Sequence, residues 1–185
     1  MKCHLLAIAA IAAIAAPALA QQVVPAQSEI SFVSKQMGVP VEGRFRLWTA
    51  QIVFDPRKPE AGKVSFTIQT GSASLGAAEA DTELSKPAWF NLARFPQASF
   101  QSSAIKALGG GKFEIRGLLA IKGISHEVLV PVAVSQAGLA SIAVGSFILK
   151  RLDFRIGDGE WADTSVVAND VQVKFKLSLN GMAPL

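Results

Sequence analysis

The chain has 185 residues, with 18 Lys and Arg against 14 Asp and Glu, which gives a net charge of +4. Its basic residues stand singly among apolar ones, so it lacks the basic runs that follow a phosphate backbone, and we expect no nucleic-acid partner. Cys3 is its one cysteine, and His4 and His126 are its two histidines. These counts exclude a disulfide framework and argue against a zinc site.

The first twenty residues predict a cleavable signal peptide. Lys2 supplies the positive charge, Leu5–Ala16 form an apolar run of twelve residues, and Ala18 and Ala20 have the small side chains of a cleavage site. The apolar run is shorter than the roughly 20 residues that a membrane-spanning helix needs. We therefore expect cleavage before Gln21, loss of the lone cysteine, a periplasmic location and no stable insertion in a membrane.

Residues 21–185 are predicted to form one all-β domain, because apolar side chains recur at every second position. Near the C-terminus, for example, Val171, Val173 and Phe175 alternate with Gln172 and Lys174, which gives a strand one buried and one wet face. The predicted strands are Glu29–Ser34, Gly43–Phe54, Gly62–Ser72, Ala98–Leu108, Lys112–Lys122, Glu127–Ser135, Leu139–Leu149 and Val171–Leu179.

Two other segments complete the predicted order. Ala77–Lys86 is rich in alanine and acidic residues and is stopped by Pro87, so it predicts one short helix between the third and fourth strands. Arg151–Asn169 is predicted to be mostly loop.

Short connectors rich in Gly, Pro and Asp join the predicted strands, which favours antiparallel neighbours. Eight such strands form either a sandwich or a barrel. We favour the single eight-stranded barrel, since closure removes exposed edges and leaves room for side chains or one small ligand. An outer-membrane barrel is disfavoured because the chain has no tyrosine and its hairpins show no consistent aromatic girdle.

The sequence shows no catalytic or metal-binding set. His126 follows Ser125 without a nucleophile elbow, so we interpret it as a turn histidine at the surface. The acidic residues of Asp153–Asp163 do not have the spacing of a calcium loop and are interleaved with arginine, which favours an ion-paired loop. Gly109–Lys112 leads into a strand and predicts a hairpin turn instead of a phosphate loop. We expect no enzyme activity, no metal and no cofactor other than a bound lipid.

The aromatic composition points to an apolar interior. Eleven Phe and three Trp occur with no Tyr, so almost all of the aromatic surface lacks a polar group. Alternating Phe and Val on strands are most often simply core. An apolar barrel that is not filled by its own side chains, however, shields a hydrocarbon from water, and each buried methylene contributes about 0.8 kcal/mol.

Several short motifs, in this order and spacing, resemble the YceI-like family of exported polyisoprenoid-binding proteins, over nearly the whole chain after the signal peptide. They are Gly43-x-Phe45, Phe54-Asp55-Pro56, Asp81-x-x-Leu84, Trp89-Phe90, Phe95-Pro96-x-x-Phe100, Gly117-x-Leu119-x-Ile121-Lys122-Gly123, Arg151-x-Asp153-Phe154 and Asp170-Val171-Gln172-Val173. The sequence departs from the family pattern at Arg155, where a glycine is usual, and at Glu83, where a histidine is frequent.

The resemblance implies a lipocalin-like antiparallel barrel whose tunnel holds an isoprenoid chain with a quinone-like or prenyl-phosphate-like head. We expect the chain to be a periplasmic carrier of an isoprenoid or other long-chain lipid; whether it forms a homodimer is left open. The predicted lining residues are Phe32, Phe45, Phe66, Ile68, Phe100, Phe113, Ile115 and Phe175, with Trp89 and Phe95 near an entrance. Arg44, Arg151 and His126 are the predicted head-group contacts.

Two alternatives remain from the sequence. One is an envelope stress-associated β-barrel module whose interior is filled by its own side chains and which acts through its surface. The other is an isomerase or hydrolase acting on a bound lipid, which requires a titratable group inside the barrel.

Overall fold

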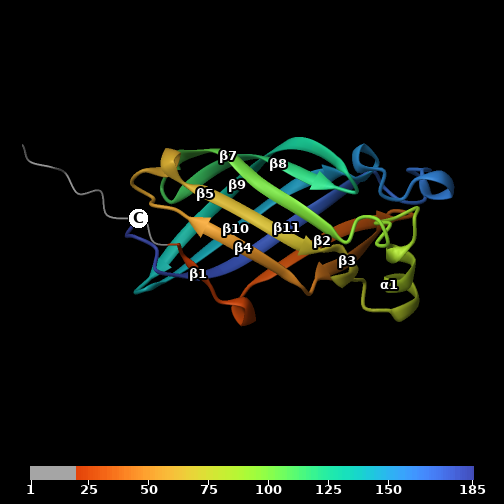
Figure 1. Ribbon diagram of the computed structural model, residues 1–185, viewed down its shortest axis with the longest axis horizontal. Coiled ribbons are helices and arrows are strands. Elements are labelled where there is room, and N and C mark those ends of the chain that lie inside the picture. Colours follow the sequence, from red (N-terminus) through yellow and green to blue (C-terminus); the bar gives the residue numbers. More distant parts are fainter. Residues whose placement is uncertain (1–19) are drawn as a thin grey trace, which may run out of the picture.

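The computed structural model describes residues 20–185 and shows one antiparallel sheet curled around an apolar interior (Figure 1). The predicted signal peptide, apart from Ala20, lies outside the described residues. The strands are β1 (Gln22–Val23), β2 (Glu29–Gln36), β3 (Val39–Phe45), β4 (Trp48–Val53), β5 (Lys63–Gln69), β6 (Ala73–Ser74), β7 (Gln97–Gly109), β8 (Lys112–Ile121), β9 (Ile124–Ala137), β10 (Ala140–Lys150) and β11 (Asp170–Asn180).

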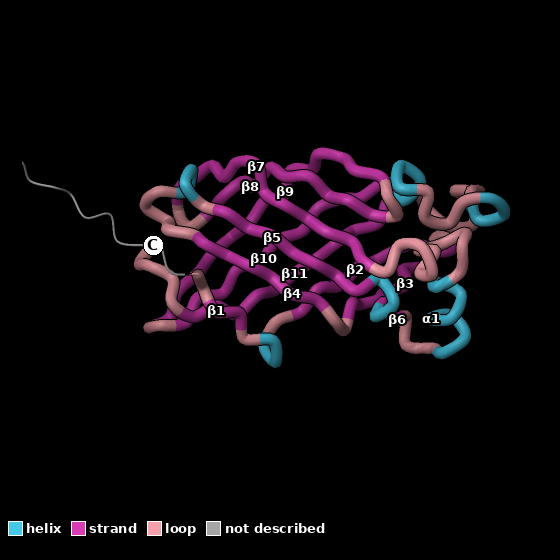
Figure 2. The backbone as a smooth tube through the Cα atoms, viewed as in Figure 1, coloured by secondary structure: helices cyan, strands magenta, loops and turns pink. Residues whose placement is uncertain are grey.

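Most of the helical structure lies at the ends of the sheet, as Figure 2 shows. The only α-helix of the described residues is α1 (Ala78–Ser85), which lies between β6 and β7. Short 3-10 turns occur at Pro25–Gln27, Pro59–Ala61, Thr70–Ser72, Arg151–Phe154 and Gly159–Trp161. The helix therefore forms where the sequence predicts it, and the predicted loop 151–169 is irregular apart from two such turns.

The described chain has eleven strands, whereas the sequence predicts eight. Two of the additional strands, β1 and β6, are only two residues long. The third arises because the predicted strand Gly43–Phe54 is two strands. Interior positions are odd-numbered in β3, at Val41 and Phe45, and even-numbered at Ile52 and Phe54. An unbroken strand cannot change the parity of its inward face, so the chain must turn between β3 and β4.

Ser72 holds this turn in place. Its carbonyl oxygen accepts the N–H of Arg46 at 3.1 Å, and its Oγ accepts the N–H of Leu47 at 3.0 Å. Leu47 in turn accepts the N–H of Gln69 through its carbonyl oxygen. The corner residues thus keep their backbone hydrogen bonds although they leave the sheet.

The strand order is β4-β5-β7-β8-β9-β10-β11-β2-β3-β6, with β1 added to β11. The β3–β4 turn joins strands from the two ends of this order, which makes the sheet curl back on itself. At the other end of the molecule, the Gln21 N–H donates to the Ile52 carbonyl oxygen at 2.8 Å while Gln22 and Val23 pair with β11. The N-terminal segment therefore bridges β4 and β11.

Two hydrophobic clusters line the interior. One contains Phe54, Phe113, Leu177 and Leu179, and the other contains Leu84, Trp89, Phe154 and Val167. Phe100, Val128 and Phe147 pack against both clusters. The core is therefore continuous along the length of the sheet, from the end that carries β1 to the end that carries α1 (Figure 1).

Candidate functional site

The curled sheet encloses an apolar cavity of about 400 Å³. This volume lies within the range of roughly 300–1,000 Å³ that small-molecule sites occupy. Apart from two tryptophans, the polar or charged residues in its wall are Ser34, Gln36, Glu83 and Arg151. Every other wall residue is apolar, so the cavity can hold a hydrocarbon and offers polar contacts at few points.

Most of the predicted lining residues lie in the cavity wall, because period-two alternation correctly assigns the inward face of each strand. The wall includes Phe32, Phe45, Phe66, Ile68, Trp89, Phe100, Phe113, Ile115 and Phe175. Phe95 is not part of it. Its ring instead covers Gly123 and lies 5.4 Å from the Arg94 guanidinium carbon. Whether the wall residues contact a lipid stays a prediction.

The two ends of the cavity differ in exposure. At the end near β1 the wall consists of buried residues such as Leu177 and Leu179, which is 1% exposed, and of the partly buried Met182. At the α1 end, Gln36 is exposed, and Leu75 and Glu83 are only partly buried. We infer that a ligand enters at the α1 end, since a hydrocarbon tail needs a dry, closed terminus and its head needs access to water.

Arg151 is the most unusual residue at the α1 end, because its side chain is 1% exposed. All five of its N–H groups donate to backbone carbonyl oxygens. Nε donates to Ala168, Nη1 to Ile156 and Gly157, and Nη2 to Trp161 and Val167, at 2.5–3.0 Å. Burial lowers the pKa of Arg151. The guanidinium therefore fixes the loop 156–168 around itself and has no donor left for a head group.

Lys122 is a second largely buried cation that links two segments at the same end. Its Nζ donates to the carbonyl oxygens of Ala88 at 3.3 Å and Arg155 at 2.5 Å, and it lies 3.8 Å from the Asp158 carboxylate. Burial lowers the pKa of Lys122, and the Asp158 charge opposes that shift. The lysine thus joins the segment after α1 to the loop 155–158.

The helix itself is held by Asp81, whose Oδ1 accepts the N–H of Leu75 at 2.6 Å. This bond, together with one from Ser74 and the nearby charge of Arg46, lowers the pKa of Asp81 below its ordinary value of 3.8. Because Leu75 lies in the cavity wall, the carboxylate links the position of α1 to the shape of the entrance.

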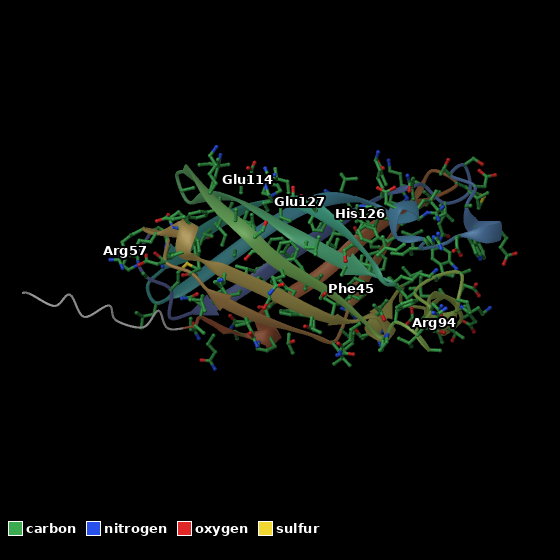
Figure 3. All side chains as sticks on the ribbon, turned by 45° about the horizontal axis from the view of Figure 1, so that its top comes forward. Phe45, Arg57, Arg94, Glu114, His126 and Glu127 are labelled. Carbon is green, nitrogen blue, oxygen red and sulfur yellow. The ribbon has the colours of Figure 1, made fainter. Side chains whose placement is uncertain are left out.

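The other two predicted head-group contacts are exposed and are not part of the cavity wall. Arg44 is between the inward-facing Gly43 and Phe45, so its side chain points outward, where it borders a polar groove with Glu42. His126 is exposed; its Nε2 lies 3.2 Å from the Asp153 carbonyl oxygen and its ring meets Phe154 edge-on at 5.0 Å. Figure 3 shows His126 toward the end of the sheet that carries the loop 151–169.

Four wall residues with polar side-chain atoms were not predicted from the sequence: Ser34, Gln36, Glu83 and Trp161. For Ser34 and Gln36 the signal was present, because they continue the alternation of Ile30 and Phe32 along β2. No comparable pattern marks Trp161, which reaches the wall through the irregular loop 151–169.

The titratable side chains in the cavity wall are Glu83 and Arg151. Glu83 forms an ion pair with Lys86, and Arg151 is saturated by carbonyl oxygens. Within residues 20–185, no three His, Cys, Asp or Glu side chains come close enough to hold a metal ion. Within the same residues, no helix is long and apolar enough to cross a membrane.

The family model of the YceI-like domain matches residues 21–179. Among solved structures, Burkholderia cenocepacia BcnA is 44% identical, with a TM-score of 0.83 over 85% of this chain and 99% of that chain. A polyisoprenoid binding domain from Saccharophagus degradans shares the fold at 18% identity and a TM-score of 0.69, over 90% of this chain and 99% of that chain.

Curated relatives match over a shorter stretch. A UPF0312 protein from Azotobacter vinelandii is 34% identical over 88 residues, which cover 48% of this chain and 46% of the relative. The chain thus spans about half the length of the curated relatives it matches.

Proposed function

This chain belongs to the YceI-like family, and from that premise we propose that it is a periplasmic carrier of an isoprenoid lipid, held in the apolar cavity. The observation that carries the proposal is the cavity itself, about 400 Å³ in volume, with an almost wholly apolar wall. A tail buried there gains about 0.8 kcal/mol per methylene, so it binds without many polar contacts.

Three further points support an isoprenoid cargo. The Saccharophagus degradans neighbour is described as a polyisoprenoid binding domain. The wall is closed at one end and open beside α1, as a single tail with a head at the surface requires. The predicted signal peptide supports the periplasmic location, where a lipid that crosses an aqueous space has to be shielded from water by an apolar cavity.

The open interior also weighs against the two alternatives. A module that acts only through its surface has no use for an apolar cavity, because an empty one forfeits packing contacts. An isomerase or hydrolase needs a free titratable group near the bound lipid. The two such groups in the wall, Glu83 and Arg151, are engaged by Lys86 and by backbone carbonyl oxygens respectively.

The test is to purify the full-length product from the periplasm of its own cells and record its mass under native conditions. We expect an adduct whose extracted mass is that of an isoprenoid quinone or prenyl phosphate. Delipidated protein should then take up ubiquinone from detergent. A bare protein mass, together with no uptake of ubiquinone or prenyl phosphates, contradicts the proposal.

A further inference from the structure

Three buried hydrogen-bonding groups in the cavity wall have no partner among residues 20–185: Ser34 Oγ, Trp89 Nε1 and Trp161 Nε1. Trp89 as a whole is 8% exposed. Buried polar atoms are almost always paired in native proteins, and an exception calls for an explanation such as an absent ligand. All other polar atoms of the wall at this end have a stated partner or face water.

These three residues converge on one end of the cavity. The rings of Trp89 and Trp161 lie 5.6 Å apart, and the Trp161 carbonyl oxygen accepts a bond from Arg151 at 2.7 Å. The carbonyl oxygen of Val167 accepts the other Nη2 hydrogen bond of Arg151. Val167 also forms an isolated antiparallel β-bridge with Gln36, at the end of β2. Ser34 lies two residues before Gln36 on the same inward face of β2, so it lines the same end of the cavity as the two tryptophans.

The donors of the wall that have no partner at this end are neutral. An indole N–H can only donate, whereas the Ser34 hydroxyl can donate or accept. Arg151 is cationic and makes no ion pair within the described part of the chain, but its five N–H groups all face carbonyl oxygens, so an anion cannot reach them. Lys86 is engaged with Glu83.

This set of donors fits a neutral acceptor better than an anion. A phosphate is held in proteins by charge-assisted bonds from Arg or Lys, and a buried charge without them is costly. A carbonyl or ether oxygen needs one or two neutral donors, and Arg151 favours its negative end through the local field without direct contact.

We propose that Ser34, Trp89 and Trp161 form a head-group subsite that takes a neutral head with acceptor oxygens, such as a quinone, in preference to a phosphate or a bare hydrocarbon end. The subsite rests on the proposed lipid-carrier function and specifies which head that carrier selects. The tail binds through the apolar wall, and the head is chosen by the two indole N–H groups and the hydroxyl.

The test compares ligands with matched tails. Delipidated protein is incubated with equal amounts of a tetraprenyl benzoquinone, geranylgeranyl phosphate and the hydrocarbon phytane, and the bound lipids are extracted after gel filtration and quantified. We expect the quinone to predominate in the wild-type protein. In Trp89→Phe, Trp161→Phe and Ser34→Ala, quinone affinity should fall about fivefold each, the worth of one net hydrogen bond, while phytane affinity stays unchanged.

Trp48→Phe is the control, because Trp48 packs against Phe66 and is not part of the cavity wall. A second readout needs no variant. In wild-type protein, two of the three indole N–H proton resonances should move when the quinone binds, and none should move by hydrogen bonding when phytane binds.

The outcomes separate the two proposals. If phosphate binds more tightly than quinone, or if the variants weaken quinone and phytane equally, the subsite is wrong and the carrier function stands. If none of the three ligands binds, the carrier function fails as well. Unmoved indole resonances in the presence of bound quinone likewise overturn the subsite.

Discussion

The ring of Phe175 on β11 lies directly across Gly145 on β10, its partner in the antiparallel register. A Cβ at Gly145 would lie 2.5 Å from the carbonyl oxygen of Pro131 and still closer to the Phe175 ring. The same arrangement recurs where Phe32 covers Gly43. Large wall residues thus fit into the sheet because glycine stands beneath them.

Gly145→Ala should destabilise the protein by about 1–3 kcal/mol, the usual range for overpacking, because the Pro131 backbone cannot move away as a side chain can. Urea unfolding measures the change. Gly71→Ala is the comparator, since its Cβ would meet only the methyl groups of Leu92, at 2.9 Å and 3.1 Å. Equal losses in the two variants would contradict this account of Gly145.

Arg151→Met should lower the free energy of unfolding by about 3–5 kcal/mol, as removing one side of a buried charged network does. Five carbonyl oxygens lose their donor in that variant. Arg151→Lys keeps the charge but supplies only three donors, so its stability should lie between those of wild type and Arg151→Met. Full stability of the lysine variant in urea unfolding would show that the planar guanidinium is not required.

The contribution of Asp81 to the stability of the fold should depend on pH in the acidic range. Its pKa is lowered in the folded protein by the Leu75 N–H. A carboxyl whose folded pKa is depressed stabilises the fold fully above its unfolded pKa of about 3.9 and loses this contribution as the pH falls through the folded pKa. The advantage of wild type over Asp81→Asn should therefore be largest above pH 4 and shrink steadily on acidification below it.

Thermal unfolding from pH 6 to pH 2 measures this difference. Glu79→Gln, on the same helix, controls for the loss of one acidic charge. A constant difference between wild type and Asp81→Asn over the whole range would exclude the link between the Asp81 carboxylate and Leu75.

Ala143 lies in the buried part of the cavity wall, so Ala143→Leu should shorten the space for a tail. At about 0.8 kcal/mol per methylene, displacing about three carbons should weaken a long-tailed ligand by roughly 2 kcal/mol. A short-tailed ligand with the same head should bind as before. The matched control is Ala133→Leu, which makes the same change at an exposed position on the adjacent strand β9. Equal effects of both variants on tail-length preference would rule out a tail in this part of the cavity.

His126→Ala and Asp153→Asn should leave lipid affinity and any effect on the bound lipid unchanged, because both residues are exposed and neither is part of the cavity wall. The quinone-binding assay measures this. The His126 variant loses an edge-on ring contact with Phe154 and should be slightly less stable. A clear fall in affinity for either variant would place the head group outside the cavity.

The strands were predictable because each has one wet face and one apolar face. Val171, Val173 and Phe175 reveal β11 without any tertiary information, and the predicted bounds of β7, β8 and β10 differ from the observed ones by at most one residue at each end. The β3–β4 turn was missed although the change of parity between Phe45 and Ile52 is visible in the sequence. Both segments are apolar enough to be read as one strand.

The entrance was harder to predict, because it is built from irregular backbone. Nothing in the residues around Arg151 shows that its side chain turns inward to five carbonyl oxygens, so the sequence suggested a head-group contact. Likewise the spacing of Trp89 and Trp161 does not reveal that their rings meet, since two separate loops bring them together.

The guanidinium of Arg151 at the entrance is surrounded by neutral carbonyl oxygens instead of a carboxylate. This arrangement determines how the entrance responds to the salt concentration. Dissolved salt weakens attractions between exposed opposite charges within a Debye length of about 8 Å at physiological ionic strength. The contacts of Arg151 contain no second charge and are closed to water. The part of the opening that Arg151 holds should therefore keep its shape from dilute buffer to concentrated salt.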